Sequence, residues 1–389
     1  MTESSLPPID LERLVADRRH FHRYPELGYQ EERTAAYIAD RLVQLGYTVR
    51  TGVGRTGVVG IRESGDGGRA VLIRADMDAL PVNEETDLPF RSTAPGVMHA
   101  CGHDGHMAVG LAVAERLARA SPAGSVKLVF QPAEEGGAGA AAMIRDGALE
   151  NPAVDAAIGI HLWSDLPTGT VAITPGPVFA SVDNFTIEIT GRGGHAAAPH
   201  QTVDPIVVAA ETVTALQTIV SRRRDPADPA VVTVTGIHAG TTHNVIPETA
   251  TLVGTVRTYG TEFRDRVPRL IEEMVTGIAT ASGASAAVRY ERLYPATVND
   301  AAVAARMTEV AATFLGRDLI RSGYRTMAAE DMAFFLERVP GCFAFVGCGN
   351  ADKGTDRPHH SPRFDLDEDA LPVAVELLSR TAVALLSAV

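Results

Sequence analysis

The feature of this sequence that most restricts its fold is a series of short β-rich runs, with helical patterns between some of them. The runs lie at residues 58–61, 70–75, 126–130 and 156–160 and are bounded by turn residues. Small and aliphatic residues at helical spacing occupy residues 105–118, and a second helical pattern begins at residue 138. Strands that alternate with helices in this way predict a mainly parallel sheet.

A different pattern begins after about Pro177. Residues 182–190 alternate polar and apolar side chains, and Asp204-Pro205 opens a helix that is expected to reach about residue 221. Strand-like runs follow at residues 231–235, 250–259 and 286–290, and an amphipathic helix at about residues 262–280 precedes the last of them. Because Pro268 lies inside that helix, we expect a kink or a later start there. The order β-α-β-β-α-β is typical of a ferredoxin-like domain.

The two ends of the chain are expected to form one domain around this insertion. A helix pair is predicted at residues 11–46, interrupted at Pro25, and helix and strand alternate again after residue 296. The simplest topology joins residues 1–178 and 297–389 in one α/β domain and leaves residues 179–296 as an inserted α+β domain. The predicted fold class is therefore α/β, a mainly parallel sheet with a ferredoxin-like insertion.

Charge and composition disfavour several classes of protein. The 35 basic and 48 acidic residues give a net charge of -13, which repels both phosphate backbones and anionic lipids. No apolar stretch approaches the roughly 18 residues of a membrane-spanning helix, and no signal or transit peptide is recognisable. We therefore expect a cytoplasmic protein with no nucleic-acid or membrane partner. Three cysteines are too few for a disulfide framework in a chain of 389 residues.

Residues suited to metal binding follow four of the predicted strands. They are Asp76 and Asp78, Glu134 and Glu135, His161, and His360 in the loop after residues 343–346. In open α/β sheets, ligands bind outside the carboxyl ends of the strands. The sequence therefore predicts one site that gathers these side chains.

The strongest local signal is the segment His99-Ala-Cys101-Gly-His103-Asp104-Gly-His106, which opens a helix. In a reduced compartment Cys101 can be a thiolate ligand, and the Cys-Gly-His step lets Cys101 and His103 turn toward one ion. Two alternatives remain: a buried thiol beside a helix cap formed by Asp104, and a catalytic Cys-His dyad. For His99 or His106 taken singly, a structural role is the better interpretation.

Glu134 and Glu135 form an acidic pair at a strand end, directly before two glycines. Two neighbouring carboxylates in a buried site raise each other's pKa unless a cation lies between them. If Glu135 binds a metal ion, Glu134 is free to act as general base and then general acid. In isolation the same pair would be read as a solvated acidic turn.

In combination, the motifs resemble the aminoacylase and carboxypeptidase family of metal-dependent hydrolases. The closest subgroup is the amidohydrolases that act on N-acyl amino acids, such as hippurate hydrolases and indole-acetyl-amino-acid hydrolases. The resemblance covers almost the whole chain, at residues 20–26, 76–81, 99–106, 131–135, 159–161, 191–195, 244–247 and 360–362. It implies a catalytic domain with two divalent metal ions and an inserted lid domain through which the protein forms a homodimer.

The resemblance also implies roles for individual residues. The metal ligands would be Cys101, His103, Glu135, His161 and His360. Glu134 would be the general base, and Asp78 would orient a ligand. In the lid, His195 would stabilise the oxyanion in the partner's active site, and Asn244 would contact the substrate. Zinc or manganese would fit this ligand set, with cobalt and nickel also open.

These features predict a metal-dependent amidohydrolase that releases an amino acid from its N-acyl derivative, an N-acetyl, N-benzoyl or aryl-acetyl amino acid. A dipeptidase or carboxypeptidase of the same family is the alternative, since it would share every catalytic residue. A metal-binding protein with a dead site is disfavoured by Glu134. A nicotinamide-dependent oxidoreductase is disfavoured because Gly52-Val-Gly-Arg-Thr-Gly57 precedes a strand instead of a helix.

Overall fold

The computed structural model describes residues 6–64 and 68–387, and the chain divides into two compact units. The first unit comprises Met1–Val178, Thr297–Arg325 and Asp331–Val389. The second comprises Phe179–Ala296 and Thr326–Glu330. The second unit is thus an insertion into the sequence of the first, apart from the short segment at residues 326–330.

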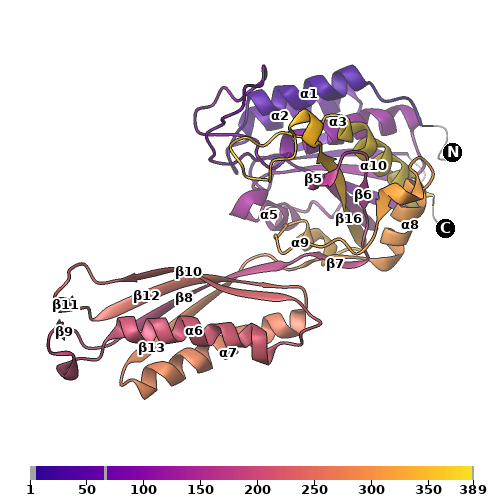
Figure 1. Ribbon diagram of the computed structural model, residues 1–389. Coiled ribbons are helices and arrows are strands. Elements are labelled where there is room, and N and C mark those ends of the chain that lie inside the picture. Colours follow the sequence, from indigo (N-terminus) through magenta and orange to yellow (C-terminus); the bar gives the residue numbers. More distant parts are fainter. Residues whose placement is uncertain (1–5, 65–67, 388–389) are drawn as a thin grey trace. The chain divides into compact units, whose positions relative to one another are not determined.

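The first unit is built on an eight-stranded sheet with the order β1-β2-β4-β3-β5-β16-β6-β15 (Figure 1). Its strands are β1 Thr48–Val53, β2 Gly57–Glu63, β3 Ala70–Asp76, β4 Ser125–Gln131, β5 Ala156–Pro167, β6 Val171–Ala172, β15 Ile320–Arg321 and β16 Gly341–Gly349. The central strands β4, β3, β5 and β16 are parallel to their neighbours in that group, whereas β2 is antiparallel to both β1 and β4. The sheet is therefore mixed, with a parallel centre as predicted.

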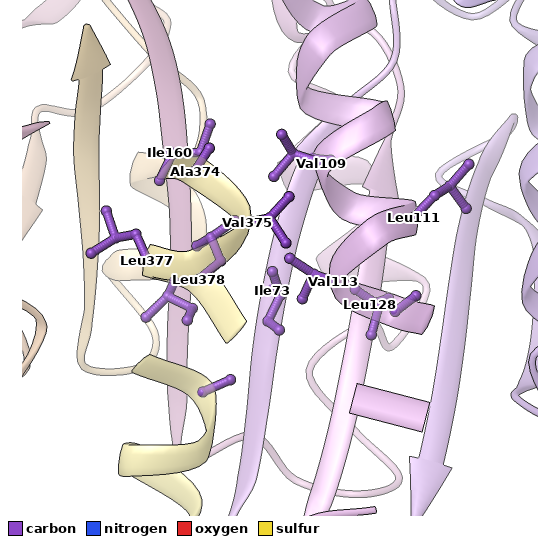
Figure 2. Close-up of a cluster of buried hydrophobic side chains, with 14 of the residues drawn as sticks. Ile73, Val109, Leu111, Val113, Leu128, Ile160, Ala374, Val375, Leu377 and Leu378 are labelled. Carbon is purple, nitrogen blue, oxygen red and sulfur yellow. The ribbon is translucent and has the colours of Figure 1, made fainter. Parts of the chain in front are cut away.

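Helices pack on this sheet through a continuous apolar core. The helices of the first unit are α1 Leu11–Arg23, α2 Glu32–Gln44, α3 His103–Ala120, α4 Glu134–Gly137, α5 Gly139–Arg145, α8 Ala301–Ala311, α9 Ala333–Leu336 and α10 Ala370–Leu386. Figure 2 shows Val109 and Val113 of α3 and Val375 of α10 close to Ile73 of β3. These side chains are at most 1% exposed, so strands and helices from both ends of the sequence share one core.

The second unit has its own sheet and its own core. The strands are β8 Ser181–Thr190, β10 Ala230–Ala239, β12 Thr249–Thr258 and β13 Ser285–Arg292, in the antiparallel order β10-β12-β8-β13. Helices α6 Pro205–Arg223 and α7 Thr261–Ala281 pack together and against these strands (Figure 1). The strand order is that of a ferredoxin-like domain, as the sequence predicted. Two-residue strands, β9 Gly194–His195 and β11 Val245–Ile246, form a separate small ladder.

Two sequence expectations need correction. Strand β1 was missed because most of its side chains are exposed and it lacks the apolar alternation of a buried strand. The later start expected at Pro268 is also wrong, since α7 already begins at Thr261. The apolar face of α7, with Val267 and Ile271 fully buried, holds the helix in place on both sides of the proline. The remaining short strands, β7 Gly176–Phe179 and β14 Thr297–Asn299, pair with each other.

Candidate metal centre

The carboxyl ends of the parallel strands bring the candidate ligands to one edge of the sheet. Asp76, at the end of β3, is level with Gln131 at the end of β4. On the other side, His161 of β5 is level with Phe345 of β16. His161 lies within β5, which continues to Pro167, and does not follow a strand as the sequence predicted. Since parallel strands point to the same edge, the residues after β3, β4 and β16 are brought to this edge although they are far apart in sequence.

The Cys101-Gly102-His103 step places two donors at the start of α3. Gly102 has a φ of 88°, in the left-handed region that favours glycine, and α3 begins at the next residue. The backbone turn directs Cys101 toward β5, where its Sγ lies 3.6 Å from Nε2 of His161. Donor atoms of Cys101, His103 and His161 all lie within 4.8 Å of one another, and all three residues are buried.

A second donor group contains Cys101, Glu135 and His360, again within 4.8 Å. Oε1 of Glu135 lies 3.1 Å from Nε2 of His360. His360 adopts a φ of 66°, and its N–H donates to the carbonyl of Ala100, 2.7 Å away. The five residues predicted as ligands therefore form two adjoining groups that share the sulfur of Cys101.

The protonation states of these groups fit a site for cations. Burial raises the pKa of the Cys101 thiol, so that a nearby cation would be needed to hold a thiolate at neutral pH. Burial lowers the pKa of His161, which keeps its imidazole neutral and able to donate a lone pair. Contacts with Cys101 and Glu135 raise the pKa of His360 to about 10, as expected where a proton occupies the place of a metal ion.

His103 supplies a further test of the fit. Its Nδ1 donates to the carbonyl oxygen of Asp78 at 2.9 Å, which leaves Nε2 to face the donor group. Within the described part of the chain, Nε2 is buried and has no hydrogen-bond partner. A buried polar atom without a partner is costly, and a divalent ion would satisfy it. The residues present therefore fit a metal pair.

Asp78 acts on the site in two ways. Its carbonyl oxygen accepts from the ring of His103, a contact made through the backbone of Asp78. Its carboxylate accepts the backbone N–H groups of Glu134 and Glu135, both at 3.0 Å. Asp78 thus holds the turn that carries the two glutamates, and this second contact was not foreseen.

Glu134 lies beside the donor groups, and its carboxylate is held from another segment. One of its oxygens lies within 4.8 Å of donor atoms of His103 and Glu135. The residue is 7% exposed, and Oε1 accepts the N–H of Asp331 at 3.3 Å. A buried, oriented carboxylate next to a cation site is suited to accept a proton and return it.

His106 and Asp76, which the motifs also contain, have structural partners. Nδ1 of His106 lies 2.6 Å from Oδ1 of Asp76, and Nε2 accepts the N–H of Leu162 at 2.9 Å. Both ring nitrogens are therefore engaged, which supports the structural interpretation of His106 taken singly. Sequence reasoning gave no role to Arg74, Gln131 and Asp331, which are hydrogen-bonded to one another. Arg74 also donates to Asp76, and the N–H of Asp331 donates to the carboxylate of Glu134. The only signal was an arginine in the middle of an apolar strand.

His195 and Asn244 belong to the second unit, where the structure brings them close to each other. β9 and β11 pair so that His195 faces Val245, and the N–H of Ala196 donates to the carbonyl of Asn244 at 3.1 Å. Nδ1 of His195 accepts the N–H of Ala197 at 3.0 Å, so the ring is oriented although it is exposed. The two residues form an exposed polar pair within the second unit.

Comparison with known proteins agrees with this architecture. Residues 72–384 match the model of peptidase family M20/M25/M40. The chain is 41% identical over 377 residues to N-acetyl-L-cysteine deacetylase of Bacillus subtilis, an alignment that covers 96% of this chain and 88% of the relative. It is 40% identical over 364 residues to thermostable carboxypeptidase 1 of Saccharolobus solfataricus, with 92% and 91% covered.

A solved structure is also similar over its whole length. A dinuclear metal binding peptidase of the M20 family from Bacillus subtilis superposes with a TM-score of 0.85 at 35% identity, and 97% of this chain and 99% of that chain are covered. The candidate donor groups described above likewise support two divalent metal ions. Among the described residues, no helix is long and apolar enough to cross a membrane. The family match and the relatives together show that the chain belongs to peptidase family M20/M25/M40.

Proposed function

We propose that the protein is an amidohydrolase that cleaves the amide bond of N-acyl amino acids, and that the residues named in the metal centre carry out this reaction. The observation that carries the proposal is that two donor groups share Cys101 directly beside Glu134. A relative with 41% identity is named a deacetylase of an N-acetyl amino acid, which supports this substrate class. Water is added across the C–N bond, and the products are a carboxylic acid and an amino acid.

Cys101, His103, Glu135, His161 and His360 would hold two divalent ions. When bound, the ions would polarise the amide carbonyl and lower the pKa of the attacking water. Zinc or manganese fits a ligand set of one thiolate, three imidazoles and one carboxylate, and cobalt and nickel also bind such donors. The shared sulfur favours a soft ion, so zinc is the first to test.

Glu134 would move the proton. Its carboxylate is oriented by the N–H of Asp331, and its backbone N–H is fixed by Asp78. It would take a proton from water during attack on the carbonyl carbon and deliver the proton to the leaving nitrogen. The same group thus serves as base and then as acid, so that the amino acid departs as a neutral amine.

The second unit would act as a lid that also forms a homodimer. We propose that His195 donates a hydrogen bond to the developing oxyanion in the partner subunit and that Asn244 contacts the substrate. Their placement on an exposed ladder of the second unit supports a role toward a ligand or another subunit. A cytoplasmic location also remains a prediction from the sequence.

A dipeptidase or carboxypeptidase is the second candidate. It is favoured by the relative named thermostable carboxypeptidase 1, which is 40% identical. The catalytic residues would be the same, because both reactions add water to an amide bond. Only the groups that contact the acyl side of the substrate would differ.

Purified protein loaded with zinc or manganese should be assayed with N-acetyl, N-benzoyl and indole-acetyl amino acids and with dipeptides. Glu134→Gln should keep both metal ions and lower kcat by at least about 100-fold, the lower range for loss of a general acid-base group. Glu135→Gln should instead lose metal, because a ligand is removed. Activity on dipeptides alone would favour the second candidate. If Glu134→Gln loses metal and Glu135→Gln keeps it, Glu134 is the ligand and Glu135 the general base.

A further inference from the structure

Arg74 is a completely buried arginine at the base of the metal centre. Its side chain is 1% exposed and lies on β3, a fully buried strand whose other charged residue is Asp76 at its end. Its guanidinium donates to three side chains: Nη1 to Asp76 at 2.7 Å, Nη2 to Asp331 at 3.0 Å, and Nε to Gln131 at 2.8 Å. One planar fork therefore joins β3, the end of β4 and the segment at residue 331.

Both carboxylate oxygens of Asp331 accept hydrogen bonds. Oδ1 accepts from Arg74 and also from Nε2 of Gln131, at 2.7 Å. Oδ2 accepts the N–H of Ala140 at 3.0 Å. The residue is 0% exposed, so these contacts are made without competition from water. Its position is thus set by the sheet and by the segment that follows the two glutamates.

The backbone of Asp331 contacts Glu134 directly. Its N–H donates to Oε1 of Glu134 at 3.3 Å, a long bond of the kind that often shortens when a substrate is bound. The amide and the carboxylate of one residue are linked through only two side-chain torsions, so a fixed carboxylate restricts where the amide can lie. Whatever holds the side chain of Asp331 therefore also sets the direction from which Glu134 is held.

We infer that Asp331 and Arg74 are positioning residues for the proton transfer by Glu134: Arg74 holds the side chain of Asp331, and the N–H of Asp331 holds the carboxylate of Glu134. This inference rests on the proposed function, because it assigns Glu134 the proton. It adds two residues to the proposed ligands and the proposed general base. Asp331 reaches Glu134 through the hydrogen bond of its N–H, and carboxylate oxygens of the two residues also lie within 4.8 Å of each other.

A role in stability alone does not account for this network. Desolvation makes a buried ion pair about neutral for stability, and well-packed apolar residues of the same volume serve as well or better. A fixed geometry, by contrast, is what a proton carrier needs, since a displacement of about 1 Å can cost about 100-fold in rate. The planar fork of arginine and its three acceptors provide that geometry.

The test is a double-mutant cycle with Asp331→Asn and Glu134→Gln. Asp331→Asn keeps the size of the side chain and removes the charge that Arg74 holds. In the wild-type background kcat should fall by about 10- to 100-fold, with KM changed less than about threefold and metal content unchanged. In the Glu134→Gln background the same substitution should have almost no further effect, because no proton carrier remains to be positioned.

Asp17→Asn is a matched control. Asp17 is also a buried carboxylate of the first unit, bound by Nη1 of Arg41 through both oxygens, and neither residue contacts the site. Its loss should lower the melting temperature and leave kcat unchanged. If Asp331→Asn fails to fold, Arg74→Lys is used in the same cycle. Lysine keeps the positive charge but lacks the planar set of donors that arginine offers. The same loss of kcat, and the same absence of a further effect in the Glu134→Gln background, are expected.

The inference is overturned if Asp331→Asn or Arg74→Lys lowers only the melting temperature, as Asp17→Asn does. It is equally overturned if the effect on kcat is fully additive with Glu134→Gln, or if metal content falls in parallel with activity. Failure of the proposed function looks different, because wild-type protein would then cleave none of the amide substrates. A wild type that cleaves only dipeptides leaves the cycle intact, with a dipeptide as substrate.

Discussion

The buried side chain of His99 should make the unfolding free energy of the first unit fall at low pH, and replacing His99 should remove this dependence. His99 is 1% exposed, and neither ring nitrogen has a hydrogen-bond partner among the residues that the structure describes. Burial lowers the pKa of His99 to about 3, against about 6.5 in an unfolded chain. Between these two values the unfolded chain binds a proton that the folded chain does not, so stability falls as the pH falls.

The size of the effect follows from the two pKa values. From pH 7.5 to pH 5, this one residue should cost about 2 kcal/mol of unfolding free energy, at about 1.36 kcal/mol for each pH unit below 6.5. His99→Leu has a similar volume and no proton to bind. The unfolding free energy of the variant minus that of the wild type should therefore be about 2 kcal/mol larger at pH 5 than at pH 7.5, whatever its value at pH 7.5.

Urea unfolding of the two metal-free proteins, followed by tryptophan fluorescence, measures this difference. The chain has a single tryptophan, Trp163 on β5, so the signal reports the first unit alone. Every other titrating group is common to both proteins, and the comparison cancels its contribution. A stability difference that is the same at pH 7.5 and pH 5 would refute the reasoning, because it would mean that buried His99 binds a proton as readily as the unfolded chain.

Three further predictions concern the site and the turn beside it. Cys101→Ala should lose metal and activity together, as measured by metal analysis and turnover, and a fully loaded, fully active variant would contradict the ligand assignment. His195→Ala should lose about 2.7 to 4 kcal/mol of transition-state stabilisation with metal retained, and mixing it with Glu134→Gln protomers should restore activity if subunits exchange. Recovery that never appears despite proven exchange would exclude a shared site. Gly139→Ala should fold poorly or melt far lower, because its Cβ would lie 1.6 Å from the carbonyl oxygen of Pro132, and normal melting would show that the turn yields easily.

The sequence predicted those parts of the fold where periodicity and burial agree. The central strands are apolar on both faces, and the order of elements in the insertion leaves few topologies. Strand β1 was not predicted because its side chains are mostly exposed. It pairs with β2 in the antiparallel direction, unlike the parallel strands at the centre of the sheet. The segment Gly52–Gly57, which matches a dinucleotide-binding spacing, instead contains the end of β1, the hairpin turn and the first residue of β2.

The part of the candidate site that could be predicted consists of residue types that commonly bind metal ions. Cysteine, histidine and paired glutamates near strand ends pointed to candidate ligands, and the structure gathers Cys101, His103, Glu135, His161 and His360 in two donor groups. The residues that hold these groups in place were not predictable in the same way. Asp331 follows no strand and stands in no recognisable motif, and only the fold shows that its amide reaches Glu134. Contacts made through the backbone leave no signature in the residue type.

The insertion also sets the order in which the chain can acquire its structure during synthesis. The sheet of the second unit is complete within residues 181–292, so its pairings need no strand from the rest of the chain. The sheet of the first unit is not, because β16 pairs with β5 across the whole insertion, and α10 packs against α3 only after the last residues emerge. A nascent chain would therefore hold a fully paired inserted sheet while the edge of β5 that pairs with β16 is still open, and His360 would be the last of the candidate ligands to leave the ribosome.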